Sequence, residues 1–186
     1  MSTLLIVILA VVALVIIWLI ATFNRLITLR NRKNEAVSDI DIQAKRRYDL
    51  IPNLVETVKG YAAHEQGTFD KVVQARSAAM NAGGTAVEKA ETENILTGTL
   101  KSLFALSENY PDLKANTNFL ELQREISDTE NKMMSARRFF NNTVTDLNNK
   151  IQKFPANLIA GMMGFKSEKF FELTNAAEAE PVKVQF

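Results

Sequence analysis

The residues that could carry out chemistry in this chain are mainly carboxylates, because its 186 residues include one histidine and no cysteine. Without cysteine the chain has no thiolate nucleophile, no disulfide and no cysteine-ligated metal. His64 precedes Glu65, but a zinc site on one helix turn needs a second histidine at position 68, which is Thr68. Phosphate-binding glycine motifs and the G-x-S-x-G nucleophile motif are also missing from the sequence. We expect His64 to lie in a loop or at a helix end.

Four carboxylates that stand close together on one predicted helix could hold a hard metal ion. A di-metal helical bundle also needs Glu-x-x-His pairs on facing helices, and the chain has none. The neighbouring Arg124 and Lys132 favour a solvated helix face instead. We therefore predict no enzymatic activity, no cofactor and no metal, with a carboxylate enzyme using a hard metal as a remote alternative. The four carboxylates are Glu121, Glu125, Asp128 and Glu130.

A basic cluster at residues 45–47 suggests contact with an anionic lipid or with a partner. If the preceding helix is upright, Arg46 lies about 33 Å beyond Asn24, several Debye lengths from the headgroups. Lys45 is expected to pair with Asp41 one turn earlier, and Arg47 to reach an acid on a facing helix. This structural role is favoured over partner binding. The candidates for partner binding are Arg46, Arg47, Tyr48 and Asn53.

Residues 154–165 are apolar on nearly every side, and Pro155 suits the first turn of a short helix. Two interpretations stay open. The segment folds over an open end of a helical bundle, helped by Phe170 and Phe171, or it forms an adaptable Met-rich contact for a partner or another copy of the chain. The candidate contact residues are Leu158, Met162, Met163 and Phe165.

An apolar segment at residues 4–23 must hold these groups at a membrane. Fifteen of its 20 residues are Leu, Ile, Val or Phe, which makes insertion favourable by about 5 kcal/mol. A helix of this length rises about 30 Å, the thickness of the hydrocarbon core. No basic residue precedes the segment, it exceeds the usual signal-peptide length, and no A-x-A-like site follows. We predict an uncleaved single-pass span.

The basic residues that follow the span predict its orientation. Residues 1–24 contain no Lys or Arg, and no acid precedes Glu35. The positive-inside rule then places the short N-terminus outside and the domain in the cytoplasm. The residues expected to contact lipid headgroups are Arg25, Arg30, Arg32 and Lys33.

Helical spacing of apolar residues continues past the span and predicts an all-α fold. The first stripe runs from Leu26 to Ala62, with Lys33 in its only gap and a kink rather than an end at Pro52. The last stripe, residues 119–154, is a long bundle or coiled-coil face. Between them, helices are expected at residues 68–80 and 85–110, the second opened by a capping box at residues 85–88 and stopped by Pro111.

The break at residues 81–84 is compatible with two bundle architectures. A kink there gives three antiparallel rods, and a reversal gives a four-helix up-and-down bundle. The predicted organisation is a transmembrane segment at residues 1–24, a helical bundle at 25–172 and a loose tail at 173–186, with a possible short strand at 182–184.

Short motifs occur along the chain in a fixed order, namely Arg46 to Val55, Val58 to Ala62, His64-Glu65, Tyr110 to Asn116, Leu122-Gln123, Thr129 to Asn131, Ala136 to Arg138, Phe140 to Asn142, Phe154 to Asn157, Gly164-Phe165 and Phe171-Glu172. Together they resemble the LemA family over nearly all of residues 20–172. The resemblance implies a bacterial inner-membrane protein with one N-terminal span, an up-and-down bundle and no established enzymatic activity. One departure is Phe140, where the family pattern leads us to expect tyrosine.

The function that the sequence favours is a membrane-anchored interaction or scaffold module. The long striped helices and the apolar segment at 154–165 predict a homo-oligomer or a membrane-protein partner. The net charge of +1 gives no indication of nucleic-acid binding. The alternative function is a bundle that binds lipid or an extended hydrophobic ligand.

Overall fold

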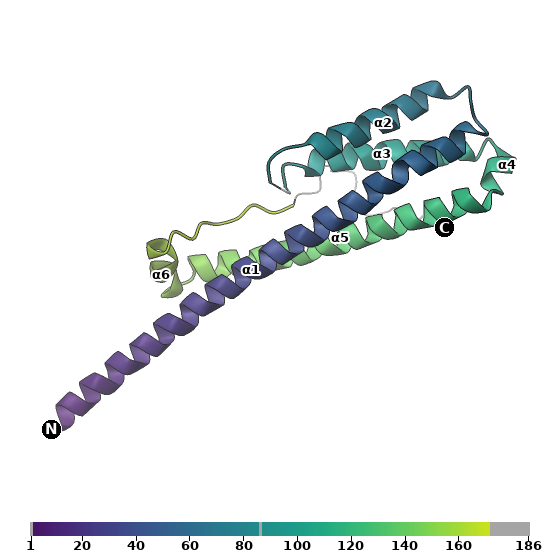
Figure 1. The fold of residues 1–186 in the computed structure, drawn as a ribbon. Coiled ribbons are helices and arrows are strands. Elements are labelled where there is room, and N and C mark those ends of the chain that lie inside the picture. Colours follow the sequence, from purple (N-terminus) through teal and green to yellow (C-terminus); the bar gives the residue numbers. More distant parts are fainter. Residues whose placement is uncertain (1, 86, 172–186) are drawn as a thin grey trace, which may run out of the picture. The chain divides into compact units, whose positions relative to one another are not determined.

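The computed structural model describes residues 2–85 and 87–171, and every regular element in that part of the chain is a helix (Figure 1). The all-α prediction is confirmed. The expected tail at 173–186, including the strand at 182–184, lies outside the described residues. The helices are α1 (Thr3–Lys59), α2 (Gln66–Asn81), α3 (Ala90–Ser107), α4 (Pro111–Lys114), α5 (Thr117–Gln152) and α6 (Ala156–Met162).

The chain divides into two compact units, and α1 and α5 contribute to both. The anchor unit consists of Met1–Ala36 and Arg138–Phe170. The bundle unit consists of Val37–Arg137 and Phe171–Phe186, of which residues 86 and 172–186 are not described.

The bundle unit is built on four helices that alternate in direction. α2 and α3 pack against each other and run antiparallel, so the break at residues 81–84 is a reversal and not a kink (Figure 1). One core joins the second half of α1, both of these helices, α4 and the start of α5. α1 continues through Pro52 to Lys59, as the unbroken stripe predicted. The central core residues are Ile51, Leu54, Val58, Phe69, Val72, Leu96, Leu100, Leu103, Leu113, Phe119 and Ile126.

Two details of the helix prediction are wrong. α3 ends at Ser107, and Tyr110 lies in the turn that leads into α4, whose first residue is Pro111. The apolar stripe of α5 also ends early, because Phe154 is 78% exposed and follows the helix rather than closing its buried face.

The turn before α3 contains the predicted capping box. The Thr85 amide donates to the Glu88 carboxylate at 2.6 Å, and the Glu88 amide donates to the Thr85 hydroxyl at 3.3 Å. The helix itself begins at Ala90, beyond this turn. Gly84 has φ +94°, and a Cβ atom there would clash with the Glu88 carboxylate. The reversal therefore depends on glycine at this position.

We expect Gly84→Ala to lower the free energy of unfolding by about 1–2 kcal/mol, through the left-handed backbone and the lost cap. Urea unfolding followed by circular dichroism measures the change. Gly83→Ala is the matched control, since a Cβ at Gly83 meets nothing within 4 Å and the residue has no positive φ. It should change the free energy by about 0.5 kcal/mol or less. Equal losses in the two variants would contradict this explanation.

The anchor unit contains the one helix, among the described residues, that is long and apolar enough to cross a membrane. Side chains along residues 4–20 are exposed, including Leu14 at 66% and Ile17 at 63%. Beyond the predicted span, Leu26 and Leu29 of α1 pack with Leu147 of α5. Ile159 and Ala160 of α6 complete this small core.

Candidate functional site

The most buried charged side chain in the described residues is Arg47 of α1, with 1% of its surface exposed. Its guanidinium forms an ion pair with Glu93 of α3, which is 4% exposed. It also donates to the Thr97 hydroxyl at 2.9 Å. The predicted bridge from Arg47 to an acid on a facing helix is therefore present. A buried charge needs such a partner, because an unpaired one is strongly destabilising.

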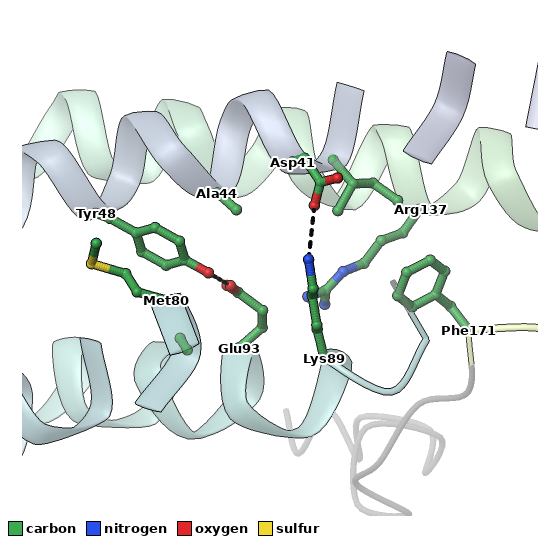
Figure 2. Close-up of a pocket in the computed structure, with 10 residues that line it drawn as sticks. Asp41, Ala44, Tyr48, Met80, Lys89, Glu93, Arg137 and Phe171 are labelled. Carbon is green, nitrogen blue, oxygen red and sulfur yellow. Dashed lines mark hydrogen bonds and ion pairs between the residues drawn. The ribbon is translucent and has the colours of Figure 1, made fainter. Parts of the chain in front are cut away.

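Tyr48 binds the second oxygen of the same carboxylate. Its hydroxyl donates to Glu93 Oε1 (Figure 2). Burial, followed by this hydrogen bond and the negative charge of Glu93, raises the pKa of Tyr48 well above 10.0. The backbone carbonyl of Tyr48 accepts from Arg76 Nε of α2 at 2.8 Å. The adjacent residues 47 and 48 thus connect α1 with both α3 and α2.

A small cavity of about 70 Å³, lined by both charged and apolar residues, lies beside this network (Figure 2). At its wall, Lys89 reaches Asp41 at 3.7 Å, and the Arg137 guanidinium stacks over the Phe171 ring at 5.6 Å. Burial, above all other causes, lowers the pKa of Arg137. The volume suits a few waters or a small ion, and is far below the ~300 Å³ of a typical ligand pocket. Its lining residues are Ile40, Asp41, Ala44, Tyr48, Ala79, Met80, Lys89, Glu93, Arg137 and Phe171.

The raised pKa of Tyr48 makes stability depend on alkaline pH. Above pH 10.0 the unfolded chain releases this proton while the folded chain keeps it, so rising pH favours unfolding. The loss is at most about 1.4 kcal/mol per pH unit, reduced by solvent screening because the side chain is half-buried. Tyr48→Phe removes this dependence but loses a hydrogen bond, about 1–3 kcal/mol at neutral pH. The stability gap between wild type and Tyr48→Phe should therefore narrow above pH 10 in urea unfolding. Parallel profiles would contradict the assignment.

Arg46, which precedes Arg47 in α1, lies on a different side of the helix and is exposed to solvent. It pairs with Glu125 of α5 and lies 4.0 Å from Asp128, which binds Lys132 at 2.8 Å. The predicted solvated face of α5 thus carries ion pairs, and no cluster suited to a metal occurs among the described residues. Surface pairs of this kind contribute about 0–1 kcal/mol each.

The same side of α1 carries Ile42 and Asn53, which are both exposed. Lys45 was expected to pair with Asp41 but pairs with Asp49 at 2.7 Å, because Asp41 points to Lys89 of α3. We call this surface the ionic face. It consists of Ile42, Lys45, Arg46, Asp49 and Asn53 of α1 with Glu121, Glu125, Asp128 and Lys132 of α5.

The predicted headgroup contacts lie in the anchor unit, and two of them have partners there. Lys33 is partly buried, with 17% of its side chain exposed, and forms an ion pair with Glu168 at 2.6 Å. The Arg30 guanidinium lies 5.4 Å from the centre of the Phe165 ring. Arg25 and Arg32 are exposed. Their contact with lipid stays a prediction.

The 154–165 segment combines features of its two interpretations. Ala156, Ile159 and Ala160 of α6 are buried, whereas three of the four predicted contact residues are exposed. Phe171 belongs to the bundle unit, where its ring lies beneath the Arg137 guanidinium, so its expected help in covering this segment stays a prediction. The exposed three are Leu158, Met162 and Met163.

Sequence reasoning missed Glu93, the acid at the centre of the buried network. The signal was present, since Glu93, Leu96, Leu100 and Leu103 occupy one helical stripe and all four are buried. An acid in an apolar stripe of α3 needs a cation from a facing helix. His64, in contrast, lies in the exposed turn between α1 and α2, as predicted.

An apolar helix of membrane-spanning length, followed by a helical bundle with a buried ion pair, defines a membrane-associated helical protein. The model of the LemA family matches residues 36–186, and the chain belongs to the LemA family. The resemblance found in the sequence is thereby confirmed.

Similar relatives extend over most of this chain. Protein LemA of Metamycoplasma hominis is 29% identical, over 87% of this chain and 72% of its own length. Magnetosome protein MamQ of Magnetospirillum gryphiswaldense is 24% identical, over 90% of this chain and 71% of its own length. Magnetosome protein MamQ 2 of Paramagnetospirillum magneticum is 23% identical over the same shares.

Proposed function

We propose that this protein is a membrane-anchored, non-enzymatic scaffold whose bundle unit associates with a second copy of the chain. The observation that carries the proposal is that the residues of the 46–53 motif lie in two different environments. Arg47 and Tyr48 are used inside the bundle, while Arg46 and Asn53 remain on the exposed ionic face.

The composition of the ionic face fits a self-complementary contact. It carries acids and bases together, so a two-fold axis can place each sign opposite the other. Ile42, 60% exposed among these charges, supplies an apolar centre. Because its ion pairs contribute little to folding, the face can exchange them for contacts with a partner.

The absence of cysteine makes a site-specific test straightforward. Ile42→Cys, treated with a bis-maleimide in native membranes, should yield a cross-linked dimer. Val73→Cys is the matched control, because Val73 is 50% exposed on α2 and outside the ionic face. A product of Ile42→Cys with another mass would overturn self-association in favour of a different membrane protein. A monomer at both positions would remove the ionic face as a docking surface.

We also propose that the bundle unit lies in the cytoplasm of a bacterial cell, with the N-terminus outside. The basic residues after the span support this orientation. A membrane-impermeant maleimide should label Ser2→Cys in intact cells, and should label Asn53→Cys only after the cells are opened. Labelling of Asn53→Cys in intact cells would reverse the orientation.

The alternative of a lipid or extended hydrophobic ligand inside the bundle receives no support from the described cavity. That cavity is about 70 Å³ and has charged walls, whereas an acyl chain needs a longer apolar channel.

A further inference from the structure

α6 packs against α1 at the point where the predicted span ends. Leu26 and Leu29, which hold Ile159 and Ala160, lie only about 4–9 Å of helical rise beyond Phe23. Thr22, inside the span, is 3% exposed, so the packed part of the anchor unit reaches the last turn of the span. Figure 1 shows α6 following the C-terminal end of α5. The interfacial layer of a bilayer is about 5–7 Å thick on each side, so α6 lies at its depth.

The outer side of α6 is unusually apolar for a surface that faces water. Leu158 and Met162 lie one turn apart on α6 and are 60% and 85% exposed, and Phe154, two residues before the helix, is 78% exposed. Met163, 57% exposed, extends the same apolar surface. Several large apolar side chains exposed within ten residues indicate a surface that a membrane or another molecule covers.

The distribution of charge between the two units indicates what covers this apolar surface of α6. The anchor unit has nine Lys and Arg against three Asp and Glu, a formal balance of +6. The bundle unit has thirteen against eighteen, a balance of −5, so the overall value of +1 conceals a strong asymmetry. Four lysines flank α6 in the sequence and suit the phosphates of an anionic membrane. They are Lys150, Lys153, Lys166 and Lys169.

We propose that α6, together with the residues beside it, is a second membrane contact, which inserts Phe154, Leu158, Met162 and Met163 into the interfacial layer of the bilayer that α1 spans. The proposal rests on α1 being the membrane anchor. The apolar side chains enter the boundary between headgroups and acyl chains, and the flanking lysines bind the phosphates above them. Two contacts at one membrane surface restrict rotation and tilt of the anchor unit, which a single span leaves free.

Fluorescence quenching by brominated lipid tests the insertion in the full-length chain. The sole tryptophan, Trp18, lies in the span and reports on the anchor itself. A second reporter is Leu158→Trp in a Trp18→Phe background, a substitution that the exposed site should accept. In nanodiscs of phosphatidylcholine and phosphatidylglycerol, shallow bromines should cause a several-fold fall in the fluorescence of this variant, and deep bromines a smaller one.

Val73→Trp in the same background is the matched control, since Val73 is 50% exposed on α2. It should keep its fluorescence. If Trp18 is quenched but Leu158→Trp behaves like Val73→Trp, α1 is in the membrane but α6 does not enter it. A second copy of the chain that covers α6 would give this same result, and the proposal would be wrong. If Trp18 itself is not quenched, the assignment of α1 as the membrane anchor is wrong.

Discussion

Replacing Glu93 with alanine is expected to lower the free energy of unfolding by about 3–5 kcal/mol. The substitution leaves Arg47, 1% exposed, without its counter-charge in the centre of the bundle unit. It also removes the acceptor of the Tyr48 hydroxyl. A typical domain is stable by only about 5–15 kcal/mol, so this loss is a large share of the total. Urea unfolding of the detergent-purified chain, followed by circular dichroism, measures it.

The matched control is Glu125→Ala, which removes the acid that pairs with Arg46 on the ionic face. Both side chains of that pair are more than 40% exposed, so the expected loss is below about 1 kcal/mol. If Glu93→Ala does not fold, Glu93→Gln provides the measurement, because it removes the charge at nearly the same volume. Its amide oxygen can still accept from Arg47, whereas its NH2 group cannot accept from the Tyr48 hydroxyl. Equal losses for Glu93→Ala and Glu125→Ala would contradict a structural role for the buried pair.

A double variant separates the ion pair from simple packing. Replacing Arg47 with methionine together with Glu93 with leucine removes both charges and leaves none unpaired. Buried pairs exchanged for apolar residues of similar volume are often neutral in stability. The double variant should therefore recover most of the stability that Glu93→Ala loses. A double variant as unstable as Glu93→Ala would assign the loss to Tyr48 or to packing instead.

The second large effect is expected in the span. Ala13→Arg with Leu14→Arg places two charges at the middle of residues 4–23, where each costs about 2.5–3.5 kcal/mol. Their sum of about 5–7 kcal/mol outweighs the roughly 5 kcal/mol that favours insertion. The double variant should move from the carbonate-resistant membrane pellet to the soluble or aggregated fraction.

Val73→Arg controls for the introduction of charge at an exposed apolar side chain. Val73 is 50% exposed and Leu14 66%, but Val73 lies on α2 of the bundle unit. This variant should stay in the membrane pellet. Retention of the Ala13→Arg and Leu14→Arg variant in that pellet would mean that contacts other than the span hold the chain there.

The sequence by itself determined the helical architecture and the apolar helix of membrane-spanning length. Both depend on local patterns, since an uncharged run long enough to cross a bilayer and a 3–4 spacing of apolar residues are properties of neighbouring positions. The capping box at residues 85–88 is equally local, and the structure contains both of its hydrogen bonds. The need of Arg47 for an acid on a facing helix also followed from its place beside the apolar stripe.

The tertiary structure alone decided which acid that is and how the charges are distributed. Glu93 lies 46 residues from Arg47, and only the reversal between α2 and α3 brings them together. The same reversal brings Lys89 to Asp41, and Lys45 forms its ion pair with Asp49 instead. The net charge of the whole chain does not reveal that the anchor unit is basic and the bundle unit acidic. Residues 138–170 join residues 1–36 in one unit only in the folded chain. Long-range pairing depends on chain topology, which local spacing does not encode.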